Sequence, residues 1–206
     1  MGFINTSVGY SYVKDFSTMA TDTTKNATFV QMKNLDRQQI YSFNIGAATP
    51  IKSWWNGYVN FWYNYQTFNG VVGVNKINTQ ISMYGAYLQQ TFNLGKEYSA
   101  EISGSYNGPG VWGGTWKTNA QGGLDIGFQK QLLQKKATIK MSVTDIFFTQ
   151  PWTAINNFGG VYIKGGGSWE SRTFRLSFNW RFGSNQIKKS RDRKTGLESE
   201  ASRIKS

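Results

Sequence analysis

The chain reads Thr-Phe-Arg-Leu-Ser-Phe-Asn-Trp-Arg-Phe from Thr173 to Phe182, with large apolar and polar side chains in strict alternation. Successive residues of a β-strand point to opposite faces of a sheet, so this stretch predicts a ribbon with one apolar and one polar face. A soluble antiparallel sheet and the wall of a membrane barrel would both carry such a ribbon. They differ in what the apolar face contacts, and the rest of the sequence distinguishes them.

The composition favours strands over helices. The 206 residues include 8 Trp, 11 Tyr, 14 Phe and 23 Gly but only 3 Pro. No apolar run approaches the roughly 20 residues that a membrane-spanning helix needs. The chain has no Cys and no His, which removes thiolate metal sites and the commonest general base. We therefore expect an all-β protein that uses no cofactor or metal and is not an enzyme.

The net charge of +12 raises the question of an anionic partner. Part of the excess lies near the C-terminus, between Lys188 and Lys205, and the other basic residues are scattered through the chain rather than gathered in one patch. Nucleic-acid binding is therefore not expected. We interpret residues 1–183 as the folded strands and residues 184–206 as a basic, disordered periplasmic tail, with contact to phosphate head groups or peptidoglycan as the alternative for the tail.

Eight stretches of the chain alternate in the same way as Thr173–Phe182. The stretch at 79–92 is the least regular, because apolar residues occur in both of its rows, and it predicts a β-bulge. The eight predicted strands are near residues 4–12, 41–47, 55–65, 79–92, 98–106, 119–129, 137–144 and 173–182.

The connections between these strands alternate between long and short. Bacterial outer-membrane barrels have short periplasmic turns and long external loops, so this pattern predicts an orientation with both termini in the periplasm. The short connections are expected at residues 49–53, 93–97 and 131–136. Long loops are expected at residues 17–37, 68–78, 107–116 and 148–167, although residues 27–32 could instead extend a strand above the membrane.

Charge placement favours the membrane wall over a soluble barrel. Every charged residue in the regular windows lies in the polar row, whereas a basic side chain facing lipid at mid-membrane costs about 2–4 kcal/mol. Aromatic residues gather near strand ends, as in interfacial girdles. A soluble barrel would instead have to pack all these rings into a narrow interior. The charged residues of the polar rows are predicted to face the lumen, where they could bind a solute, contact a plug domain or form ion pairs with one another. They are Glu101, Asp125, Lys140, Arg175 and Arg181.

Three segments, 170–183, Ser142–Phe147 and 193–200, resemble the C-terminal end of TonB-dependent outer-membrane receptors, in particular the outer-membrane β-barrel subgroup common in Bacteroidetes. The resemblance implies a barrel of about 22 strands, plugged by an N-terminal domain and energised by the TonB system. This chain has room for eight strands and no plug. We therefore expect the last third of a receptor barrel, with Met1 an internal or truncated start. Outer-membrane lipid, the missing strands and the plug would be its partners, and TonB would be reached only through that plug.

The resemblance also implies a role for the last apolar row. It is similar to the C-terminal signal that the barrel-assembly machinery reads, and the alternative is a lipid-facing wall with no further role. The row consists of Leu176, Phe178, Trp180 and Phe182. The expected function is uptake of a large, scarce nutrient through the outer membrane of a Gram-negative cell. The alternatives are a complete eight-stranded barrel with a structural or adhesive role and a soluble ligand-binding barrel.

Overall fold

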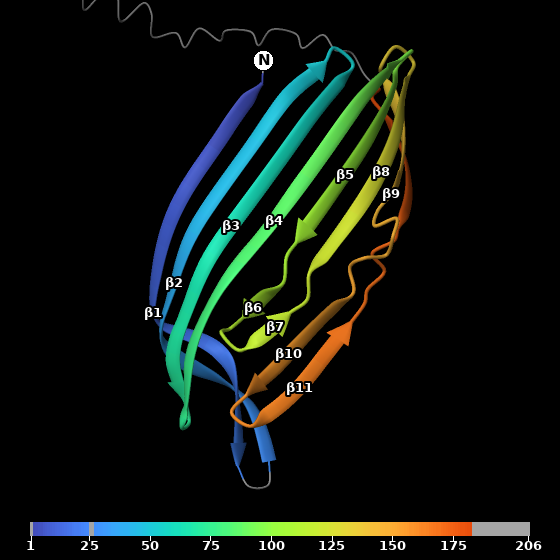
Figure 1. Ribbon diagram of the computed structural model, residues 1–206. Helices are drawn as coiled ribbons and strands as arrows, with labels where there is room; N and C mark the ends of the chain where they lie inside the picture. Colours follow the sequence, from blue (N-terminus) through green and yellow to red (C-terminus); the bar gives the residue numbers. More distant parts are fainter. Residues whose placement is uncertain (1, 25–26, 183–206) are drawn as a thin grey trace, which may run out of the picture.

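The computed structural model describes residues 2–24 and 27–182 and consists of two antiparallel sheets (Figure 1). The larger sheet has eight strands, in the order β1-β2-β3-β4-β5-β8-β9-β12. Their bounds are β1 (Phe3–Thr24), β2 (Ala27–Lys52), β3 (Trp55–Val72), β4 (Asn75–Gly95), β5 (Tyr98–Asn107), β8 (Gln121–Leu132), β9 (Ala137–Val143) and β12 (Phe174–Trp180). The all-β, meandering antiparallel fold expected from the sequence is confirmed.

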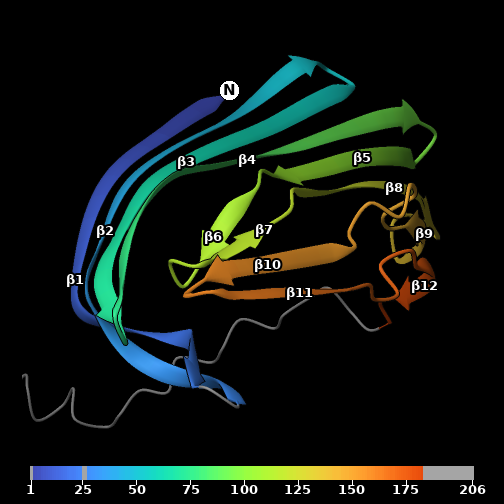
Figure 2. The same ribbon diagram turned by 60° about the horizontal axis from the view of Figure 1, so that its bottom comes forward.

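The smaller sheet has four short strands, in the order β11-β10-β7-β6. They are β6 (Gly110–Trp112), β7 (Trp116–Thr118), β10 (Trp152–Phe158) and β11 (Val161–Gly167). Figure 2 shows that the large sheet is strongly curved and that these hairpins lie inside its curve. None of the described residues belongs to a helix long and apolar enough to cross a membrane.

The two ends of the large sheet differ in their connections. At one end, here called the turn end, the strands join through tight turns at residues 53–54, 96–97 and 133–136. At the other, the hairpin end, lie the tips of β1–β2 and β3–β4 and the β6–β7 and β10–β11 hairpins (Figure 1). Within the described chain β1 pairs only with β2 and β12 only with β9, so the sheet has two open edges.

Cross-strand register brings the predicted apolar rows onto one face. Directly paired residues of neighbouring strands point to the same side of a sheet. The Ile126–Val143 and Val143–Phe174 pairs, for example, place apolar side chains of β8, β9 and β12 side by side. A second such row crosses β1 to β4 and consists of Ile4, Ala47, Val59 and Leu88.

The predicted bulge within residues 79–92 is wrong. Pairing of β3 with β4 runs without a shift, and the irregularity lies between Asn93 and Gly95, opposite β5. The alternation is masked because β4 is apolar on both faces near the hairpin end. There Ile81 packs against the buried core, and a Cβ placed on Gly110 of β6 would lie 2.7 Å from Cε of Met83.

The four predicted long loops are largely strands. Residues 17–37 extend β1 and β2, and β3 joins β4 through a turn at 73–74 in which Gly73 has φ of 60°. Residues 107–116 contain β6, and residues 148–167 contain β10 and β11. Backbone pairing needs no apolar side chains, so polar hairpins rich in Thr and Asn pair without the alternation that marks a wall strand.

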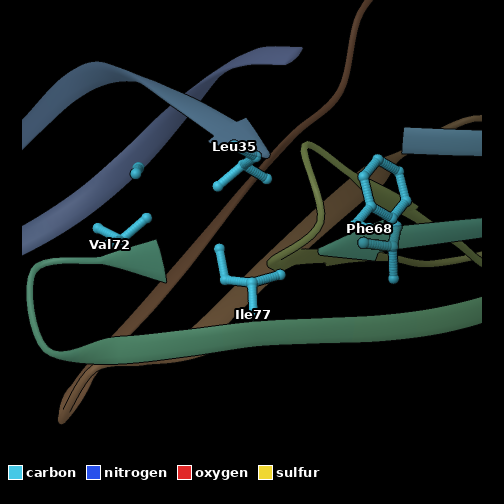
Figure 3. Close-up of a cluster of buried hydrophobic side chains, with 6 residues drawn as sticks. Leu35, Phe68, Val72 and Ile77 are labelled. Carbon is cyan, nitrogen blue, oxygen red and sulfur yellow. The ribbon is translucent and has the colours of Figure 1, made fainter. Parts of the chain in front are cut away.

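The buried apolar core is small and lies at the hairpin end (Figure 3). Leu35 and Phe68 are its largest fully buried members, and Phe16, Ile81 and Phe158 pack around it. The cluster consists of Ala20, Leu35, Phe68, Val72, Ile77 and Val111. The predicted tail, residues 184–206, lies outside the described residues.

Candidate functional site

The polar face of the large sheet is its concave face. Thr79, in the same row of β4 as Gln89, donates a hydrogen bond from Oγ1 to the carbonyl oxygen of Gly114 at 2.8 Å. Gly114 belongs to the β6–β7 turn, and Figure 2 places that hairpin inside the curve of the sheet. The row that contains Thr79 therefore faces inward, and the apolar rows face outward.

Amide side chains cover much of the concave face and satisfy one another. Asn44 and Asn60, diagonal neighbours on β2 and β3, exchange side-chain hydrogen bonds of 3.3 and 3.1 Å. Nε2 of Gln89 donates to Oε2 of Glu101 at 2.8 Å. A hydrogen-bonded polar surface of this kind is typical of the water-facing interior of a large membrane barrel.

All five charged residues predicted to face the lumen lie in the inward row. Register pairs Asp125 with Ser103, Lys140 with Gln129 and Arg175 with Ser142, while Glu101 lies opposite Gly127. Arg181 follows β12 in the same alternation, and its backbone N–H donates to the Lys136 carbonyl at 2.8 Å.

The predicted internal pairing of these charges is not seen in the described residues. Glu101 and Lys140 approach across Gly127, since a Cβ at that glycine would lie 3.9 Å from Glu101 Cβ and 3.8 Å from Lys140 Cε. No ion pair forms between them. The cationic groups of Lys140, Arg175 and Arg181 have no hydrogen-bond or ion-pair partner in the described part of the chain.

A cationic pocket lies at the turn end of the concave face. It has a volume of about 580 Å³ and is bounded by the β8–β9 turn, β9 and β12. None of its lining residues is acidic, and the four cationic ones are Lys135, Lys136, Lys140 and Arg181. Sequence reasoning assigned two of them and treated Lys135 and Lys136 only as turn residues. Their position at the same end of the hairpin as Lys140 was the available signal.

Asp125 has a structural partner that the sequence did not reveal. Its Oδ1 accepts the backbone N–H of Asp145 at 2.8 Å, and Asp145 is itself fully buried. The Asp145 carboxylate accepts hydrogen bonds from the backbone N–H and Oγ1 of Thr149, at 2.9 and 3.1 Å, and from Oγ of Ser171 at 2.6 Å. The two carboxylates thus fasten β8, the segment after β9 and the segment before β12 together.

The β1–β2 hairpin is fastened to the small sheet. Oγ1 of Thr18 donates to the Gly113 carbonyl at 3.2 Å, and Nδ2 of Asn156 donates to Oγ1 of Thr21 at 3.3 Å. These bonds tie β1 to the β6–β7 turn and to β10. The hairpin end of the concave face is therefore partly covered by the chain itself.

The convex face presents an opposite surface. Away from the hairpin end its side chains are mostly apolar or aromatic and exposed, with exposed fractions of 81% for Val8, 63% for Leu176 and 41% for Ile102. Leu176, Phe178 and Trp180 follow one another in the outward row of β12, and Phe182 lies just beyond that strand. A continuous apolar surface of this extent marks contact with a membrane or another protein.

A family model supports the membrane reading. The model for the outer membrane protein beta-barrel family matches residues 1–180, and the chain belongs to this family. The expected class, an outer-membrane β-barrel protein, is thereby confirmed, together with the outer-membrane location. No curated protein and no solved structure matched the chain.

Proposed function

We propose that this outer-membrane barrel chain forms part of the wall of a larger transport barrel of the TonB-dependent receptor type, which takes up a large, scarce nutrient. The observation that carries the proposal is the pair of open edges, the outer sides of β1 and β12. A backbone N–H or C=O that is unpaired in lipid costs several kcal/mol, so membrane sheets close or add neighbouring strands. Strands beyond the described residues would cover both edges.

Closing β1 directly onto β12 fits the sheet poorly. β1 has 22 residues and β12 has 7, so most of β1 would remain without a partner. The exposed fractions of the side chains also indicate that β1 lacks a neighbouring strand. Ile4 and Val8 at the edge are 74% and 81% exposed, whereas Ile126 inside the sheet is 42% exposed. The edge residues lack a lateral neighbour that an additional strand would supply.

The concave face supports a wide lumen. An eight-stranded barrel is just wide enough for its interior to be filled with side chains, whereas larger barrels hold water or a plug. Here the concave side holds two hairpins and amide-rich rows, together with the unpartnered cations Lys140, Arg175 and Arg181. We propose that these cations contact the plug or the passing solute. The TonB system would act through the plug and not on this chain directly.

The outward row of β12 would serve assembly as well as the wall. Leu176, Phe178 and Trp180 are exposed on a short edge strand, and Phe182 beyond it is 82% exposed. An apolar edge strand that has no neighbour on its outer side is a suitable template for strand addition. We propose that the barrel-assembly machinery reads this row before the neighbouring strand covers the edge.

Disulfide cross-linking tests the larger barrel, and the absence of native Cys makes the result simple to read. A control pair, Val8→Cys with Phe43→Cys, joins directly paired residues of β1 and β2 and should form a disulfide. Test pairs combine Val8→Cys with Leu176→Cys, Phe178→Cys or Trp180→Cys. We expect no bond within the chain for these pairs in outer-membrane fractions. Efficient cross-linking would establish the complete eight-stranded barrel and overturn the proposal.

Transport is tested separately in the producing cells. A strain without the gene should lose accumulation of one nutrient, and the complemented strain should lose it when the inner-membrane proton gradient is dissipated. Accumulation that is unaffected by dissipation would contradict a TonB-coupled role, whatever the cross-linking shows.

A further inference from the structure

On the convex face of β1 to β4, the side chains change from apolar and aromatic to tyrosine, then to amide and finally to cationic toward the hairpin end. Each step is one row of directly paired residues. The first row is Val8, Phe43, Tyr63 and Tyr84, and the second is Tyr10, Tyr41, Tyr65 and Ser82. The third row is Tyr12, Gln39, Thr67 and Gln80, and the fourth is Lys14, Arg37, Asn69 and Asn78.

The tyrosine side chains of the second row point their hydroxyl groups toward the amide row. The rings of Tyr10, Tyr41 and Tyr65 lie side by side, with centroids 5.0 and 6.3 Å apart. The Tyr10 hydroxyl accepts from Nε2 of Gln39 at 3.1 Å, and the Tyr65 hydroxyl donates to Oε1 of Gln80 at 2.8 Å. The apolar bodies thus adjoin the hydrocarbon-like row, and the polar tips reach the amide row, as aromatic residues do at a membrane interface.

The fourth row carries an uncompensated positive charge. Lys14 and Arg37 are direct cross-strand partners, an arrangement that is destabilising for like charges. Lys76 lines the same pocket, whose volume is about 540 Å³, and Asp36 is its one acidic lining residue. In the described part of the chain, none of the three cations forms an ion pair or a side-chain hydrogen bond. All three side chains are exposed.

We propose that this pocket binds the phosphate-bearing head group of a membrane lipid in the leaflet at the hairpin end. The inference rests on the proposed membrane wall. If the tyrosine row marks the membrane interface, the cationic row, which follows the amide row, lies at the level of the lipid head groups. A phosphate would relieve the repulsion between Lys14 and Arg37 and accept hydrogen bonds from both. The amides of Asn69 and Asn78, in the same row, suit the hydroxyl groups of a glycolipid head group.

A binding measurement on the full chain in detergent micelles tests the site. The probes are diphosphoryl lipid A, monophosphoryl lipid A and a zwitterionic phospholipid, with affinity followed by microscale thermophoresis. Affinity should fall in that order. Removing juxtamembrane cations should weaken binding of diphosphoryl lipid A by about fivefold for each charge, and by about a hundredfold for the triple variant Lys14→Gln, Arg37→Gln and Lys76→Gln.

The concave pocket provides the matched control. The triple variant Lys135→Gln, Lys140→Gln and Arg181→Gln removes the same charge from the opposite face and should bind the lipid as the unsubstituted chain does. Equal losses in both triples would show a non-specific charge effect and overturn the site. Full competition by inorganic phosphate would assign the pocket to a free anion instead of a lipid.

The head-group proposal and the membrane-wall proposal can be disproved separately. Heat-modifiable migration of each variant in outer-membrane fractions reports whether the sheet has assembled. A variant triple that assembles and binds lipid A as tightly as the unsubstituted chain overturns the head-group site and leaves the proposed wall intact.

Discussion

The wall and the hairpin end of this protein place their apolar side chains on opposite sides of the sheet. In the wall, Val8 and Leu176 are exposed on the convex face while amides and charges occupy the concave face. At the hairpin end, Phe68 and Leu35 are buried on the inside, as in a water-soluble domain. One continuous strand, β3, takes part in both. The same strand therefore carries its apolar side chains on opposite faces in the two regions, as expected for a wall that faces lipid and a hairpin end that faces water.

The largest expected effect breaks the hairpin end. Replacing Phe68 by Ala removes the largest fully buried side chain and should destabilise the hairpins by about 3–5 kcal/mol. Hydrogen exchange should rise in β1–β4 near the core, while β8 and β9 keep their protection. Equal loss of protection throughout the sheet would mean that the two regions fold as one unit.

An arginine on the convex face should break the wall. Ile126 lies in the outward row of β8, and Ile126→Arg should cost about 2–4 kcal/mol and block barrel assembly. Ser103→Arg places the same charge in the inward row of the neighbouring strand β5, opposite Asp125, and serves as the control. Heat-modifiable migration in outer-membrane fractions measures both. Normal assembly of the Ile126 variant would contradict a lipid-facing β8.

Substitution of the buried carboxylate tests the joint between β8 and β12. Asp145→Asn keeps the shape but leaves a donor of Ser171 or Thr149 without an acceptor, which should cost about 1–3 kcal/mol. Asp125→Asn loses only charge assistance to one backbone N–H and should cost less. Urea unfolding in detergent compares the two. A larger effect at Asp125 would reverse the assigned roles.

The smallest expected effect distinguishes an assembly signal from plain wall. Leu176→Ser with Phe178→Ser removes apolar area from one edge strand, and Ile4→Ser with Val8→Ser removes similar area from the other. Their stabilities should be close. Pulse-chase labelling should nevertheless show slower assembly only for the β12 pair, and equal rates would reduce the row to lipid-facing wall.

The wall was predictable because its alternation is local. The rows around Ile126 and Phe178, and the inward placement of Lys140, follow from the two-residue period of a strand. The hairpins were read as loops because both faces of residues 17–37 carry polar side chains, so no period is visible. The irregular row at Ile81 and Met83 was misread because contacts with the small sheet, distant in sequence, make both faces apolar.

Some residues of the candidate sites could be predicted from the sequence, and others could not. Glu101, Lys140 and Arg175 were found from their place in the alternation, whereas the buried position of Asp145 and the grouping of Lys14 with Arg37 depend on which strands pair and in which register. Sequence alone determined the strand class and the apolar and polar faces of the wall strands, because side-chain period is a local property. Only the tertiary structure decided the open edges, the hairpin core and the charged pockets, because these depend on cross-strand register and on contacts between residues far apart in the chain.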